Sequence, residues 1–235
     1  MKNSILQFLI FLLILTATVN IAHAQTKASI KAGVNFSSVI FEDETGDRSE
    51  NQLIPGMQLG LSVDVPVAGA FYIQPGLLYS RKGFKTRNSW FAGSGNNFKV
   101  TVSYIEVPLN FLYKPTLGRG KLLLGAGPYL GYGTGGEWEA EEPVIIGDII
   151  LHPNHGDVIF RNDAMDGGGL NSYIYGKPLD YGANFMAGYE FFNKISAQFN
   201  VQLGLANLIP EYADGTKRDG TFQNIGFGIS LGYKL

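Results

Sequence analysis

The most regular feature of this chain is a strict alternation of large apolar residues with small or polar ones. Over residues 225–235 the apolar set is Ile225, Phe227, Ile229, Leu231, Tyr233 and Leu235, and the intervening set is Gly226, Gly228, Ser230, Gly232 and Lys234. Successive side chains of a β-strand point to opposite faces, so this segment predicts a strand with one bulky face and one nearly bare face. A soluble sandwich would cover the second face with charge. Glycine instead suits the narrow lumen of a barrel whose outer face meets lipid.

The same alternation recurs seven more times along the chain. The expected strands cover residues 30–36, 56–65, 71–80, 105–114, 122–133, 180–191, 195–205 and 225–235. Eight is an even number, as single-chain outer-membrane barrels of bacteria require. We therefore predict an all-β fold, an eight-stranded antiparallel up-and-down transmembrane β-barrel.

The connections between these strands alternate in length. Tight turns are expected at residues 65–71, 113–122 and 191–195, and long polar loops at residues 37–53, 83–98, 135–178 and 207–221. This segregation is typical of barrels with short periplasmic turns and long extracellular loops. Pro75, Pro108 and Pro128 fall inside expected strands. Because proline donates no ladder hydrogen bond, we expect bulges or locally missing bonds there.

The first residues indicate export. Lys2 supplies a positive start, residues 8–15 are uniformly apolar, and Ala22-His23-Ala24 provides small residues at a cleavage site. This pattern predicts a secretory signal peptide over residues 1–24 and a mature barrel domain over residues 25–235. An uncleaved anchor helix is the alternative, but the apolar part is short for a membrane span.

Composition narrows the class further. The formal net charge of −2 argues against a nucleic-acid partner, and the absence of cysteine excludes disulfides and a lipoprotein signal. After the signal, no apolar run approaches the length of a membrane helix. A membrane location therefore requires a closed barrel, since open sheet edges cannot be satisfied in lipid. We expect localisation to the outer membrane of a Gram-negative bacterium.

Four short motifs carry a family resemblance. They are residues 104–109 (YIEVPL), residues 125–131 (GAGPYLG), residues 74–79 (QPGLLY) and residues 187–191 (AGYEF). Together they resemble the PorT-like outer-membrane beta-barrel family of Gram-negative bacteria, over essentially all of the mature chain. The resemblance implies a porin-like outer-membrane barrel of a family in which prolines within strands are common. It also implies a role in protein secretion by the type IX system, which is that of the family's namesake.

Charges that face the expected lumen are the first candidate functional residues. They are Lys31, Asp64, Glu106, Lys114, Lys121, Glu190 and Lys234. Buried charge must be paired, so we hypothesise a plug of salt bridges that closes the barrel. A gated pore is the alternative, but eight strands leave room only for side chains. Glu106 lies nearer mid-depth, and strand order makes Lys31 or Lys114 its expected partner. A catalytic acid is the alternative there, but no second carboxylate is placed beside Glu106.

The third loop holds the only histidines that remain after signal cleavage. His152, His155 and Asp157 are weak candidates for a metal site, because two imidazoles and a carboxylate lie within six residues. They could equally decorate a solvated loop that contains ordinary turn residues. No cofactor motif is present, and we expect no cofactor and no assigned metal. The purpose of the long third loop, residues 137–177, is left open.

Three function classes stay open. The first is a non-enzymatic outer-membrane barrel, structural or secretion-accessory, that interacts through its extracellular loops. The second is a barrel enzyme acting on outer-membrane lipid or peptide, although no Ser-His-Asp set can be ordered from the sequence. The third is a soluble lipocalin-like binder, which the bare inward positions Gly125, Gly127, Gly131 and Gly133 disfavour. Expected partners are outer-membrane lipid and lipopolysaccharide, the barrel-assembly machinery, and secretion-system or surface proteins.

Overall fold

The computed structural model describes residues 26–89, 93–146, 148–151, 154–163, 169 and 171–235. The expected signal peptide, residues 1–24, lies outside the described residues. Within the described ranges, no helix is long and apolar enough to span a membrane.

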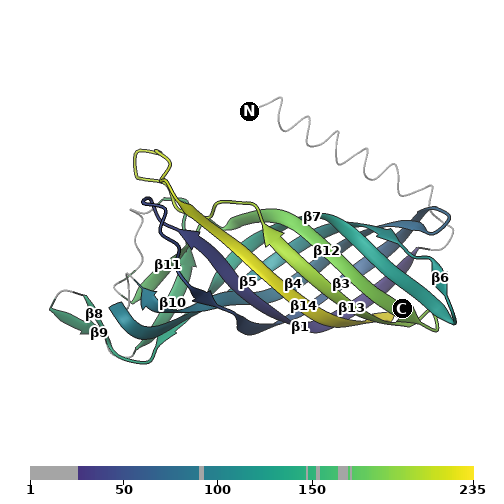
Figure 1. Cartoon of the computed structure of the whole chain (residues 1–235), viewed down its shortest axis with the longest axis horizontal. Helices are drawn as coiled ribbons and strands as arrows, with labels where there is room; N and C mark the ends of the chain where they lie inside the picture. Colours follow the sequence, from purple (N-terminus) through teal and green to yellow (C-terminus); the bar gives the residue numbers. More distant parts are fainter. Residues whose placement is uncertain (1–25, 90–92, 147, 152–153, 164–168, 170) are drawn as a thin grey trace.

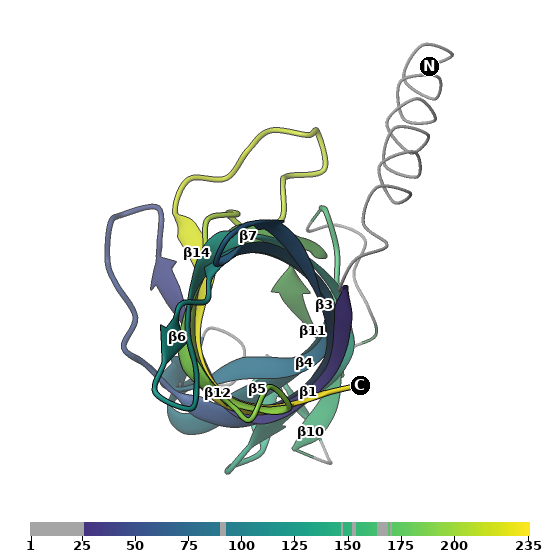
Figure 2. The same ribbon diagram turned by 90° about the vertical axis from the view of Figure 1, so that its right-hand side faces the viewer.

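Eight long strands form one closed antiparallel barrel (Figure 1). They are β1 (Lys27–Glu42), β3 (Ile54–Ala68), β4 (Phe71–Ser89), β5 (Gly93–Tyr113), β7 (Gly120–Ala140), β12 (Leu179–Phe191), β13 (Ile195–Gly204) and β14 (Thr221–Lys234). Each pairs with the next in sequence, and β1 pairs with β14 from Ser29↔Lys234 to Glu42↔Thr221. Figure 2, a view along the barrel, shows the ring that this last pairing closes. The prediction of an eight-stranded up-and-down barrel is confirmed.

The two ends of the barrel differ as expected. At the short-turn end, β3 and β4 are joined through Gly69 and Ala70, and β12 and β13 through residues 192–194. The third short connection contains β6 (Thr116–Leu117). The opposite, loop end carries β2 (Asn51–Gln52), β8 (Val144–Ile146), β9 (Ile149–Leu151), β10 (His155–Phe160) and β11 (Ser172–Gly176). Figure 1 shows β6 at one end of the barrel and β8 to β11 at the other.

The prediction of irregular long loops is wrong in two places. Residues 83–98 are mostly strand, because β4 and β5 continue as a ribbon to Ser89 and Gly93. Within the third loop, β10 pairs antiparallel with β7, and β11 pairs parallel with β10. The barrel wall therefore rises on one side as a sheet extension built from β4, β5, β7, β10 and β11.

The reason is that the polarity of the wall inverts partway along these strands. On β5, Val107 and Ile105 face outward and are about half exposed, while Glu106 faces the lumen. Beyond them the order reverses: Val102 and Val100 face inward and are fully buried. The strand keeps its period of two while the apolar set changes face. An outward apolar belt suits lipid, and an inward apolar core suits a part of the barrel that stands in water.

The strand prolines interrupt the ladder without shifting it. The β5–β7 pairing stops at Pro108↔Tyr129 and resumes in the same register at Phe111↔Ala126. The β4–β5 pairing likewise skips from Pro75↔Leu109 to Leu78↔Glu106. The expectation of bulges or locally missing bonds at these prolines is thus met by missing pairs. The β5–β7 register shifts between Ser103 and Tyr104 because β7 carries an extra residue there, Thr134, at the level where the wall changes polarity.

Candidate functional site

An ionic cluster fills the lumen at the short-turn end. We call it the basal cluster, and it contains Lys31, Asp64, Gln74, Lys114, Glu190 and Lys234. Lys114 is at its centre, with Nζ 2.6 Å from Asp64 Oδ2 and 2.9 Å from Glu190 Oε2. Lys234 Nζ lies 2.5 Å from the same Glu190 oxygen and 3.8 Å from Asp64 Oδ2. Three lysines and two carboxylates, 3 − 2, leave the basal cluster with a formal charge of +1.

Two of the predicted lumen lysines, Lys31 and Lys121, have no carboxylate of the described residues within ion-pair distance. Lys31 Nζ donates to Gln74 Oε1 at 2.8 Å, and the Gln74 amide in turn donates to Asp64 Oδ1 at 2.7 Å. Lys121 is half-buried beside Glu190 in the β7–β12 register. It makes no ion pair with the described residues. Of the predicted charges, Lys31, Asp64, Lys114, Glu190 and Lys234 come together, and Lys121 and Glu106 do not join them.

Above the basal cluster the lumen narrows to a small polar chamber of about 50 Å³. Amide side chains are the commonest group in its lining, which includes Gln58, Asn110, Asn184, Gln198, Asn200 and Gln202. Asn184 donates to Asn110 Oδ1 at 2.8 Å across it. One water molecule needs roughly 10–15 Å³ of cavity volume, so the chamber has room for a few water molecules and for no larger ligand.

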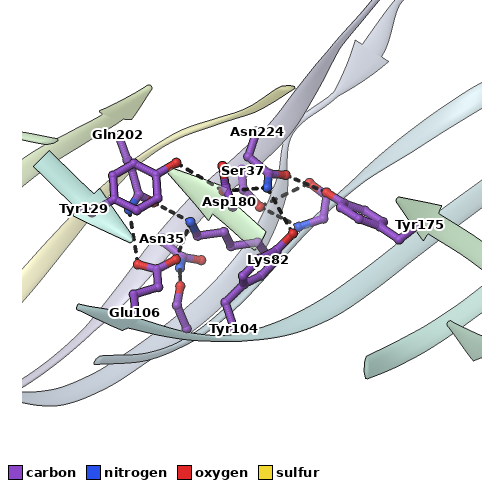
Figure 3. A network of polar contacts seen from close by, with 12 residues as sticks. Asn35, Ser37, Lys82, Tyr104, Glu106, Tyr129, Tyr175, Asp180, Gln202 and Asn224 are labelled. Atoms are coloured by element: carbon purple, nitrogen blue, oxygen red, sulfur yellow. Dashed lines mark hydrogen bonds and ion pairs between the residues drawn. The ribbon is translucent and has the colours of Figure 1, made fainter. Parts of the chain in front are cut away.

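Figure 3 shows a second polar cluster, two of whose members, Glu106 and Gln202, also line this chamber. We call it the upper network; its members are Lys82, Tyr104, Glu106, Tyr129, Tyr175, Asp180, Gln202 and Asn224. Lys82 forms an ion pair with Glu106, and Gln202 bridges the two by accepting from Lys82 and donating to Glu106 Oε2 at 3.1 Å. The ammonium also lies 5.3 Å from the ring centres of Tyr104 and Tyr129.

The other carboxylate of the upper network is Asp180, which is fully buried. Its Oδ2 accepts hydrogen bonds from Asn224 Nδ2 at 2.9 Å and from the Tyr129 hydroxyl at 3.1 Å. Its Oδ1 has no partner among the described residues. One lysine faces two carboxylates here, so the upper network has a formal charge of 1 − 2, or −1.

The expectation that Lys31 or Lys114 pairs with Glu106 is wrong. Strand order predicts which strands are neighbours, but it does not give the position along the barrel axis at which their side chains meet. The β4–β5 register aligns Leu78 with Glu106, so Lys82 lies four residues further along the same inward face and reaches back. Sequence reasoning missed Lys82 because it ended this strand at Ser80. The continuing period of two through Phe84 was the signal.

Beyond the upper network the barrel mouth is filled by a hydrophobic core, here called the mouth core. It includes Phe84, Phe98, Val100, Val102, Trp138, Val158, Tyr173, Tyr175, Leu208 and Phe222. β11 delivers Tyr175, whose hydroxyl donates to Asn224 Oδ1 at 2.6 Å and so joins the core to the upper network. Burial raises the pKa of Tyr175 well above its usual value, which keeps that donor protonated. β10 delivers Phe160, whose ring occupies the space over Gly133.

The outer face of the sheet extension carries a groove of about 770 Å³. We call it the charged groove, and its charged walls are Arg81, Lys85, Lys99, Glu137, Glu139, Glu141 and Asp157. Cations occupy β4 and β5, and carboxylates occupy β7 and β10. Lys99 Nζ lies 2.6 Å from Glu139 Oε1, and Lys85 Nζ 3.3 Å from Glu141 Oε1. Hydrogen bonds from Asn97 and then Lys85 lower the pKa of Glu141.

The weak metal candidates are only partly placed. His152 lies outside the described residues. His155 and Asp157 are both exposed on β10, two residues apart on the same outward face. Within the described part of the chain, no three histidine, cysteine or acidic side chains gather closely enough to hold a metal ion.

The family comparison agrees with this architecture. The profile of a family described as "Outer membrane protein beta-barrel domain" matches residues 23–210. No curated protein sequence matches the chain. Among solved structures, OprG from Pseudomonas aeruginosa shares 12% identity over 91% of this chain and 98% of its own, with a TM-score of 0.48. Ail of Yersinia pestis (12%, 90% and 100%, 0.40) and Neisserial surface protein A (10%, 90% and 100%, 0.41) are similar at the same level.

Proposed function

The chain belongs to the outer membrane protein beta-barrel domain family, and we propose that it is a closed, non-enzymatic barrel that acts through its extracellular extension. Family membership gives an outer-membrane location in a Gram-negative bacterium. The short turns then face the periplasm, and the sheet extension stands outside the cell.

The filled lumen is the observation that carries this proposal. A solute would have to displace the basal cluster, cross a chamber of about 50 Å³, and then pass the upper network and the mouth core. Breaking a buried ion pair costs about 3–5 kcal/mol, so two such clusters make spontaneous opening rare. A porin or a lipocalin-like carrier needs free internal volume, which these contacts occupy. The soluble lipocalin-like alternative also conflicts with the outward apolar belt.

The extension is built to present a fixed surface. Its strands continue the barrel wall, and the mouth core holds β10 and β11 against them. The hairpin of β8 and β9 projects from it with Ile145 and Ile150 paired on one face, 64% and 53% exposed. Exposed apolar pairs of this kind are suited to contact with another protein. Residues on this extension, and not the lumen, are therefore the ones we assign to function.

The resemblance to PorT-like proteins suggests that the partner is a component of type IX secretion. A strain lacking this chain should then secrete type IX cargo poorly, and the wild-type gene should restore secretion. Ile145→Ser with Ile150→Ser should fail to restore it while the barrel keeps its heat-modifiable gel mobility. Leu53→Ser, which changes an exposed apolar residue elsewhere at the loop end, is the matched control. Normal secretion by the null strain would reject the secretion role.

We also propose export by a cleaved signal peptide. The N-terminus of the protein isolated from outer membranes should be Gln25. A mature chain that begins at Met1 would contradict this.

A further inference from the structure

The cationic side of the charged groove begins directly above the apolar belt. Tyr79, Ile105, Tyr132 and Leu179 are successive cross-strand neighbours on β4, β5, β7 and β12 and form one apolar row around the outer wall. Arg81 faces the same way two residues beyond Tyr79, which is about 7 Å further along the strand. The polar layer on each side of a bilayer core is about 5–8 Å thick. Arg81 therefore lies at the depth of the lipid head groups.

The guanidinium of Arg81 is incompletely satisfied by the protein. Its Nε is buried and has no hydrogen-bond partner among the described residues. The two ion pairs of the charged groove, Lys85–Glu141 and Lys99–Glu139, leave Arg81 out. A buried donor without an acceptor is costly, so an oxygen brought by a ligand would be stabilising here.

Two further cations, Lys85 and Lys99, lie on the same outer face, with Lys85 four residues beyond Arg81 on β4. Lys85 and Lys99 stand directly opposite each other in the β4–β5 register, an arrangement in which like charges repel. Lys99 pairs with Glu139 on the neighbouring β7, and Lys85 reaches across β5 to Glu141. Both pairs are partly exposed, so they contribute little. Lysine stems are long and flexible enough to turn toward the membrane. An anion between these side chains and Arg81 would relieve the repulsion.

The geometry points to a phosphate as this anion. A guanidinium presents a planar fork of donors that fits phosphate oxygens, and added ammonium groups suit a doubly charged ester. The four carboxylates of the groove, those of Glu137, Glu139, Glu141 and Asp157, line its β7 and β10 side. They repel the anion and confine it to β4 and β5. We propose that Arg81, with Lys85 and Lys99, binds the phosphorylated head group of an outer-leaflet glycolipid. This inference does not depend on the closed lumen or on a secretion role.

The test uses the mature chain in detergent and bisphosphorylated lipid A as the probe. Native mass spectrometry measures the bound fraction for wild type, Arg81→Gln, and Arg81→Gln with Lys85→Gln and Lys99→Gln. Each cation at a membrane surface contributes about 1 kcal/mol, so Arg81→Gln should bind about fivefold more weakly and the triple variant about a hundredfold. Lys217→Gln, which removes an exposed cation from the fourth loop, should bind like wild type.

Two further arms identify the source of the phosphate. Lipid A from which both phosphates have been removed should bind wild type and the triple variant equally weakly. Inorganic phosphate should compete poorly, because the acyl chains hold the head group at this depth. The proposal is overturned if the triple variant binds bisphosphorylated lipid A like wild type. It is also overturned if Lys217→Gln loses as much binding as Arg81→Gln, or if removal of the phosphates changes nothing. Unaltered heat-modifiable mobility checks that each variant is folded.

Discussion

Lys114 and Asp64 form an ion pair across the lumen, with 2.6 Å between Nζ and Oδ2. Lys114 directly follows β5, and Asp64 lies on β3. These two strands are separated by β4 in the barrel wall, so the contact links strands that share no ladder hydrogen bonds. Glu190 on β12 accepts from the same ammonium and extends the link to the opposite wall. The basal cluster thus braces the barrel from within as well as filling it.

The charge count of the basal cluster predicts which variants are harmful. Asp64→Asn removes one of two carboxylates that face three lysines and raises the formal charge from +1 to +2. We expect a loss of about 3–5 kcal/mol in unfolding free energy, the usual cost of an uncompensated buried charge. Lys31→Met leaves two lysines with two carboxylates and should cost about 1 kcal/mol, that of one hydrogen bond. Urea unfolding in detergent, followed by gel mobility, measures both. Equal losses would contradict the charge argument.

The upper network has a formal charge of −1, opposite in sign to that of the basal cluster, so here the loss of the lysine should be the harmful change. Lys82→Met leaves Glu106 and Asp180 without a cation and should cost about 3–5 kcal/mol. Asp180→Asn brings the network to neutrality, keeps an acceptor for Tyr129 and Asn224, and should cost about 1 kcal/mol or less. Combining Lys82→Met with Glu106→Gln should recover part of the Lys82→Met loss, which a double-mutant cycle reports. Strict additivity of the two changes would be evidence against the pairing.

The mouth core should unfold separately from the part of the barrel whose outward apolar residues face lipid. Phe98→Ala removes a fully buried ring from the mouth core and should cost about 3–5 kcal/mol locally. Limited proteolysis of intact cells should then cut the sheet extension, while the barrel keeps its heat-modifiable mobility. Phe111→Ala, on the same strand but in the lipid-facing belt, is the control and should leave the extension protected. Equal protease resistance of Phe98→Ala and wild type would argue against this division.

His155 in the third loop should not support tight zinc binding. His155 is exposed, and no three-ligand group lies near it in the described ranges. Calorimetric titration of zinc into wild type and His155→Ala should give the same flat trace. Heat release in wild type that disappears in His155→Ala would show that His155 binds the metal.

The transmembrane half of this fold could be predicted from the sequence because lipid on one side and a narrow lumen on the other impose a strict period. Ile229 and Leu231 face out and Gly228, Ser230 and Gly232 face in, as the alternation of β14 predicts. Register and depth could not be predicted in this way, since neighbouring strands shift along one another. Lys82 was therefore not recognised as the partner of Glu106.

The extracellular half escaped prediction for a different reason. There the apolar set moves to the inner face, so Val100 and Val102 continue a strand that Ile105 and Val107 had defined on the outer face. A prediction that follows the outward apolar residues alone therefore ends each strand where the lipid-facing surface ends. The sequence also suggests that inward glycines such as Gly133 leave empty space in the lumen, but the ring of Phe160 fills the space over Gly133. Such contacts between β7 and β10 depend on how the third loop folds back.

The most direct test of the closed barrel is electrical recording on the purified wild-type protein in a planar bilayer. Insertion is checked beforehand by heat-modifiable mobility of the same sample. We expect a silent bilayer with no steady current, since the basal cluster, the upper network and the mouth core fill the lumen one after another. Stepwise, long-lived conductance that scales with the amount of folded protein would contradict it.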